Sequence, residues 1–207
     1  MQAVSGTVYV VDDDQGLRET LEDLLASFGL HVVSFASAME YVANAKVDAP
    51  SCLLLDVELP DINGLELQRQ LAAQEHPPIV FITGHADIPS SVRAIKAGAV
   101  DFLAKPFNNQ ELLSAIHSAF QRQQETRDAL SELAALRARL AILTPREREV
   151  LSLVVSGLLN KQSAAQLGIS EVTMQIHRRQ VMRKMAAESL ADLVRMAVKL
   201  GIPEPAA

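Results

Sequence analysis

Residues 53–67 read LLLDVELPDINGLEL, and this stretch decides how the first half of the chain can fold. Three leucines end in Asp56, and Pro60 and Gly64 then interrupt the chain before a helical periodicity begins. A short apolar run bounded by turn residues is typical of a buried parallel strand. We therefore expect Asp56 at the carboxyl edge of a sheet, where open α/β folds bind their ligands and where a buried carboxylate needs a partner.

Strands and helices alternate on both sides of this stretch. Between the apolar, β-branched runs, apolar residues recur at the spacing of a helix. This alternation predicts an α/β domain with a doubly wound, five-stranded parallel sheet, followed by a long helix from about Asn109. The expected strands are 7–11, 31–35, 51–55, 79–82 and 100–103, and the expected helices between them are about 17–28, 37–44, 65–73 and 89–97.

Polar residues gather at one edge of the expected sheet. Asp12 and Asp13 follow the first strand, Asp56 ends the third, Thr83 follows the fourth and Lys105 follows the fifth. An acidic run alone is typical of a solvated helix start, but five such residues converge here. Clustered carboxylates favour a hard divalent cation, most naturally Mg²⁺. The cation would hold a phosphoryl group against Asp56 as nucleophile, with Lys105 and Thr83 meeting its oxygens.

With these positions filled, residues 7–121 resemble a response-regulator receiver domain. The resemblance implies that Asp56 accepts phosphate from a sensor histidine kinase. It also implies that Asp13, Asp56 and the main-chain carbonyl of Glu58 bind Mg²⁺, assisted by Asp12.

The same resemblance implies a cis Lys105–Pro106 bond and a switch pair formed by Thr83 and Phe102. An ordinary core position for Phe102 is equally compatible with the sequence. A haloacid-dehalogenase-type phosphatase also uses an aspartyl nucleophile on such a sheet, but it carries a second Asp two residues later, where Glu58 stands here. We therefore do not expect an enzyme.

Charge divides the chain into two unlike parts. Residues 1–121 hold 6 Lys/Arg against 16 Asp/Glu, and residues 122–207 hold 13 against 9. An acidic part joined to a basic part predicts two domains, the second with a polyanionic partner. The single cysteine, Cys52, is expected to be a buried hydrophobe, and with no membrane-spanning or signal segment it fits a cytoplasmic protein.

A helical linker over 122–142 is expected to join the domains, because no Pro or Gly occurs between 109 and 142. Its leucines form a stripe typical of a coiled-coil seam. The same stripe is also typical of a helix that packs on its own domains, and both interpretations stay open. The stripe consists of Leu133, Leu136, Leu140 and Leu143, extended backward by Ala129 and Thr126.

Residues 143–202 predict an all-α domain of four helices. Thr144 and Pro145 start the first helix, and Gly157 ends it. A short helix from Asn160 ends at Gly168, and a third restarts at Ser170 and runs to about Met185; a fourth covers about 189–200. A short helix, a tight turn and a second helix form a helix-turn-helix.

The third of these helices carries a basic cluster that includes Arg178, Arg179 and Lys184. A charge run is usually a solvated face, but Gln and Arg on this helix are the side chains that read base edges in the major groove. An output domain that binds RNA or protein is the alternative. RNA readers usually offer stacking aromatics, and residues 144–207 contain none, which favours duplex DNA.

The second half resembles the LuxR-type output domain, so the chain as a whole resembles the FixJ/NarL family of response regulators, in the FixJ–TodT branch. The resemblance implies a phosphorylation-activated transcriptional regulator that binds promoter DNA as a homodimer and works with RNA polymerase. It makes Gln175, Ile176 and Arg179 base-facing, and it directs Lys161, Thr173 and Lys184 toward phosphates.

Overall fold

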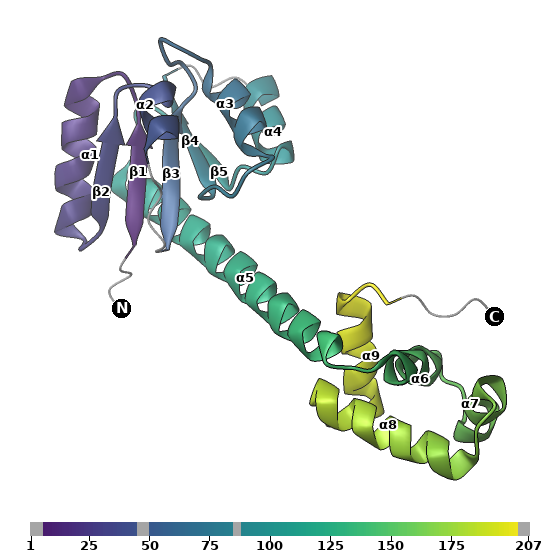
Figure 1. The fold of residues 1–207 in the computed structure, drawn as a ribbon. Coiled ribbons are helices and arrows are strands. Elements are labelled where there is room, and N and C mark those ends of the chain that lie inside the picture. Colours follow the sequence, from purple (N-terminus) through teal and green to yellow (C-terminus); the bar gives the residue numbers. More distant parts are fainter. Residues whose placement is uncertain (1–5, 45–49, 85–87, 203–207) are drawn as a thin grey trace. The chain divides into compact units, whose positions relative to one another are not determined.

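The computed structural model describes residues 6–44, 50–84 and 88–202, and it divides the chain into two compact units. The first unit extends to Thr126 and the second begins at Arg127. Helix α5, Asn109–Ala141, begins in the first unit and ends in the second. Figure 1 labels the helices and strands of both units.

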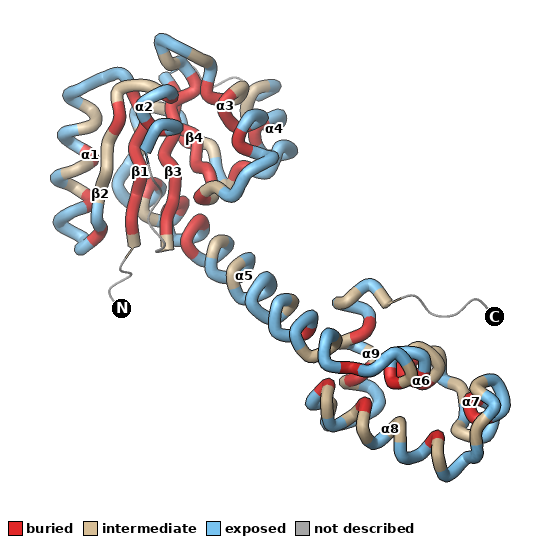
Figure 2. Tube along the Cα trace, in the orientation of Figure 1, coloured by how far each residue is buried: buried red, intermediate tan, exposed pale blue. Residues whose placement is uncertain are grey.

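The first unit is built on the five-stranded parallel sheet that the sequence predicts, and its strand order is β2-β1-β3-β4-β5. Each strand lies within one residue of the range expected from its apolar run. Strands β1, β3 and β4 are buried at every position, which explains why they read as continuous apolar runs rather than alternating ones (Figure 2). The strands are β1 Thr7–Val11, β2 His31–Phe35, β3 Ser51–Asp56, β4 Ile79–Thr83 and β5 Asp101–Ala104.

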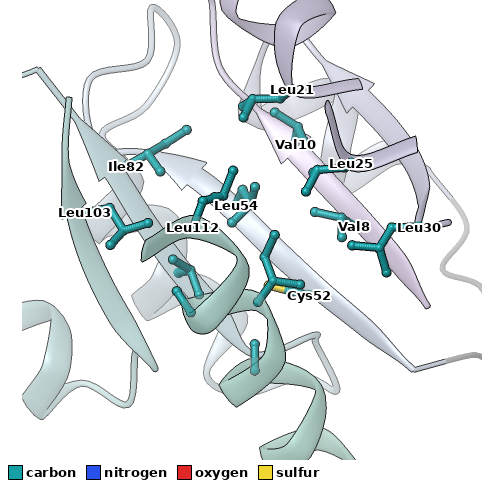
Figure 3. Packing of buried hydrophobic residues seen from close by; sticks show 14 of the residues in the cluster. Val8, Val10, Leu21, Leu25, Leu30, Cys52, Leu54, Ile82, Leu103 and Leu112 are labelled. Atoms are coloured by element: carbon teal, nitrogen blue, oxygen red, sulfur yellow. The ribbon is translucent and has the colours of Figure 1, made fainter. Parts of the chain in front are cut away.

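Helices cover both faces of this sheet. Alternate strand residues such as Val10 and Leu54 pack with Leu21 and Leu25 of α1 and with Leu112 of α5 (Figure 3). The intervening residues of the same strands form a second cluster with α2, α3 and α4. The helices are α1 Gln15–Ser27, α2 Ala38–Ala43, α3 Gly64–Leu71 and α4 Ile88–Lys96.

The turn between β3 and α3 is held tightly against the sheet edge. The Gly64 amide donates to the Val57 carbonyl at 2.9 Å. A Cβ atom at Gly64 would clash with the main-chain carbonyl oxygen of Asp56. Glycine therefore lets this loop return directly beside Asp56.

In the part of the second unit that the structure describes, four helices follow α5. A capping box of Thr144 and Glu147, with Pro145 in the first turn, starts α6 as the sequence predicts. Gly168 ends α7 in the left-handed conformation, at φ 63°, and Ser170 caps α8. The helices are α6 Pro145–Val155, α7 Asn160–Leu167, α8 Glu171–Met185 and α9 Leu190–Lys199.

The leucine stripe of α5 packs within the second unit. Leu136 and Leu143 are each only 3% exposed, and Leu140 packs on the cluster that contains Leu143. The earlier positions Thr126 and Ala129 are exposed. Of the two interpretations of the stripe, the structure supports packing on its own domain for the last three leucines.

Candidate functional site

Three carboxylates meet at the carboxyl edge of the sheet. One oxygen each of Asp12, Asp13 and Asp56 lies within 4.8 Å of the others. Asp12 and Asp56 are buried, whereas Asp13 is exposed. Asp12 and Asp13 follow β1 and Asp56 ends β3, the neighbouring parallel strand, which is why Asp56 meets residues at least 43 positions before it.

Lys105 lies between two of these carboxylates. Its Nζ donates to Asp12 Oδ2 at 2.6 Å and to Asp56 Oδ2 at 2.5 Å. Burial disfavours the charged ammonium, but the hydrogen bonds that it donates to both carboxylates outweigh this and raise the pKa of Lys105. Burial also raises the pKa of Asp12, against the opposing effect of the Lys105 hydrogen bond. Three carboxylates and one ammonium leave a net charge of about −2, which a divalent cation would neutralise.

The remaining expected residues of the first unit lie on β4 and β5 and in the segments that follow β3 and β5. The Glu58 amide donates to Asp56 Oδ1 at 3.0 Å. Thr83 is fully buried at the end of β4, and its carbonyl accepts from the Lys105 amide at 2.7 Å. Phe102 is half-buried on β5, with its ring 6.0 Å from that of Phe81. The Lys105–Pro106 peptide bond is cis, as the receiver resemblance implied.

Three other polar residues of the first unit have roles that the sequence did not predict. Arg18 Nη1 donates to the Asp12 carbonyl at 2.6 Å, and the Asp14 side chain caps α1 by accepting from the Leu17 amide. Asp61 accepts from the first amides of α2. Cap spacing could have revealed Asp14, but no sequence signal marks Arg18 or Asp61, because their partners depend on the tertiary fold.

The second unit presents a polar and cationic surface on its helix-turn-helix. Gln175, Ile176 and Arg179 are exposed on α8, and Lys161 is exposed near the start of α7. The opposite side of α8 carries Met174, Val181 and Met185, which are completely buried. The structure therefore brings the expected base-facing residues together on one solvent-facing side of α8.

Three other expected DNA contacts have partners inside the unit. Arg178 Nη1 donates to Asn160 Oδ1 at 3.0 Å, and Thr173 Oγ1 lies 2.8 Å from Ser170 Oγ. Lys184 Nζ donates to Glu147 Oε2 at 2.6 Å. The sequence showed the polar character of these side chains, but it could not show which neighbour each one meets.

The Lys184–Glu147 pair predicts a pH-dependent stability. The hydrogen bond from Lys184, with one from the Thr144 amide, lowers the pKa of Glu147 below its ordinary value of 4.5. A depressed carboxyl pKa stabilises the fold above pH 4.5, and this contribution is lost as pH falls through the folded-state pKa. We expect Glu147→Gln to cost the second unit about 2 kcal/mol at pH 7 and progressively less below pH 4.5.

The measurement is urea unfolding of both proteins between pH 3 and 7, with Glu149→Gln as the control. Glu149 pairs with Arg146 on the surface, at 53% side-chain exposure, so its replacement should cost under about 0.5 kcal/mol. A Glu147→Gln cost that does not shrink in acid would contradict this prediction.

Together, the two units define the class of protein: an α/β domain with three carboxylates and a lysine at the carboxyl edge of its sheet, in one chain with a helix-turn-helix domain. The chain belongs to the response regulators that join a receiver domain to a LuxR-type DNA-binding domain. Residues 8–117 match the response regulator receiver domain family, and residues 141–197 match the luxR family of bacterial regulatory proteins. Such proteins are two-component transcriptional regulators and not enzymes.

Relatives and solved structures agree with this assignment. Nodulation protein W of Bradyrhizobium diazoefficiens is 52% identical over 94% of this chain and 86% of its own length. The response regulator TodT of Pseudomonas putida is 44% identical over 95% and 87%. The structure of the response regulator StyR is similar with a TM-score of 0.79 and 46% identity, covering 93% of this chain and 98% of that one. Among the described residues, no helix has the length and apolar character needed to cross a membrane.

Proposed function

We propose that Asp56 is the phosphoryl acceptor and that a sensor histidine kinase supplies the phosphoryl group. The observation that carries this is the Lys105 ammonium held between Asp12 and Asp56, with the third carboxylate of Asp13 beside them. An Asp56 carboxylate oxygen would attack phosphorus, and the kinase phosphohistidine nitrogen would leave. Lys105 and the Thr83 hydroxyl would then bind the phosphoryl oxygens.

We propose Mg²⁺ as the cofactor of this site. Asp12, Asp13 and Asp56 offer only oxygen ligands, and the net charge of about −2 that remains beside Lys105 suits a divalent cation. The Glu58 main-chain carbonyl would complete the protein ligands. When bound, the metal supplies charge neutralisation of the phosphoryl oxygens.

Phosphorylation is proposed to favour a homodimer. It adds about −1.5 to −2 charges at Asp56, and Thr83 and Phe102 would move in response as the switch pair. An apolar stripe on α4 of the same domain fits a dimer surface. Ile88, Val92 and Ile95 recur at helical spacing and are 80%, 45% and 46% exposed.

On DNA, we propose that α8 enters the major groove of each half-site. Gln175, Ile176 and Arg179 would face base edges, and Lys161 and Thr173 would face phosphates. The exposure of the first three and of Lys161 supports this. Because Arg178 and Lys184 already bind Asn160 and Glu147, we propose that their first role is to hold α7 and α6 against α8.

The domain limits are proposed as 7–121 for the receiver, 122–142 for the linker and 143–202 for the DNA-binding domain. Promoter DNA as the target would place the protein in the cytoplasm, with RNA polymerase as a further partner.

The function is tested by adding acetyl phosphate and Mg²⁺ to the purified full chain. We expect the mass by light scattering to rise from monomer to dimer and the affinity for a selected duplex to rise with it. The matched control adds acetyl phosphate with EDTA in place of Mg²⁺. A protein that gains one phosphate but changes neither mass nor DNA affinity would contradict the proposed switch.

A further inference from the structure

The outward face of α8 consists of five exposed side chains, whose spacings of one, three and four residues place them on one side of the helix. They lie opposite the buried residues Met174, Val181 and Met185. This spacing places every member of the outward face where an incoming groove would meet it. The outward face is Val172, Gln175, Ile176, Arg179 and Arg183.

Val172 is the member of this face nearest the start of the helix. It is the second residue after the Ser170 cap, and its side chain is 67% exposed. It precedes Ile176 by one helical turn and Arg179 by two, so it lies in line with both. At this exposed position, the valine side chain buries little apolar surface within the unit. Its β-branched side chain also lowers the helix propensity. The second unit itself therefore gives no structural reason for a valine at this position.

The charges around Val172 indicate what covers it. Arg179 and Arg183 share its face, and Lys161 is exposed on the preceding helix. Such cations complement a phosphate backbone rather than an apolar protein surface. Inside a major groove, the apolar group that a valine can meet is the C5-methyl of thymine. The first residues of a recognition helix are also those that contact base edges.

We propose that Val172 reads a thymine by contact with its 5-methyl group. The proposal rests on α8 entering the major groove and adds a specificity-determining residue to that contact. Gln175, one turn further on, has the amide that pairs with adenine. The preferred half-site should therefore contain a thymine methyl next to the base that Gln175 reads.

The test uses the full chain treated with acetyl phosphate and Mg²⁺, and a duplex selected from a random library by the wild-type protein. Each thymine of one half-site is replaced singly by deoxyuridine, which removes only the methyl group. For the wild type, we expect one such replacement to weaken binding about fourfold. This factor corresponds to the free energy of burying one methyl group. For Val172→Ala, the same replacement should change affinity less than about 1.5-fold, because the two γ-methyl groups that reach the thymine methyl are gone and the shorter alanine side chain stops short of it.

Val198→Ala is the matched control, because Val198 lies on α9 at 71% exposure, close to that of Val172. It should keep the wild-type pattern of deoxyuridine effects, and Val172→Ala should keep the wild-type affinity for random-sequence DNA. Equal deoxyuridine losses in wild type and Val172→Ala would overturn the methyl contact. If the library yields no enriched duplex, DNA reading by α8 is what fails, and the proposal fails with it.

Discussion

Replacing Asp56 with asparagine is expected to abolish phosphorylation by acetyl phosphate in the presence of Mg²⁺. The asparagine amide cannot act as the nucleophile, although it has the size and shape of the carboxylate. Asp56 accepts from Lys105 Nζ at 2.5 Å and from the Glu58 amide at 3.0 Å. The fold should survive, because the substitution also removes one of three carboxylates that repel one another. Intact-protein mass spectrometry after incubation gives the stoichiometry.

Asp61→Asn is the matched control for this substitution. Asp61 lies in the same β3–α3 turn, but its carboxylate accepts from the amides of Ala38 and Met39 at the start of α2. It should be labelled as fully as the wild type, and a thermal melt should show that both variants are folded. If the Asp56→Asn protein is still labelled stoichiometrically, at Asp12 or Asp13, then Asp56 is not the acceptor.

The sheet and its acidic edge were predictable from sequence because both depend on local signals. The leucines before Asp56 are buried on both sides of the sheet, so they form an uninterrupted apolar run that needs no tertiary information to recognise. The parallel order then brings Asp12, Asp56 and Lys105 to the same edge. The alternation of strands and helices was sufficient for this step.

The partners of long charged side chains were not predictable in the same way. Arg178 and Lys184 belong to a basic cluster that suggests DNA phosphates, yet each meets a residue at least 18 positions away in sequence, Asn160 and Glu147 respectively. The charge of a residue indicates which groups it can bind, but it does not indicate which neighbour lies close enough to be bound. That choice depends on how α6, α7 and α8 pack.

The leucine stripe shows a similar ambiguity for apolar residues. Its period fits a partner helix in another chain or a helix of the same domain equally well. In the structure, Leu136 lines a groove together with Met196 of α9, and the Lys199 ammonium pairs with Glu132 across the same two helices. The last turns of α5 therefore belong structurally to the DNA-binding unit.

Leu136→Ala is expected to destabilise that unit by about 3 kcal/mol, since a leucine at 3% exposure loses its apolar contacts and leaves a cavity. Because the cost falls on the contact between α5 and α9, amide exchange should accelerate in α9, at Leu190–Lys199, while the core strands of the receiver keep their protection. Hydrogen–deuterium exchange on the full chain separates these two regions.

Leu130→Ala provides the control for this prediction because it makes the same chemical change on the same helix at 53% exposure. Its effect should stay within about 0.5 kcal/mol, and α9 should exchange as in the wild type. The coiled-coil interpretation gives the opposite pattern: Leu136→Ala would then weaken the dimer and make stability depend on protein concentration, with no change in α9 of the monomer. Finding that pattern would show that the stripe pairs between chains, despite its packing on α9 within one chain.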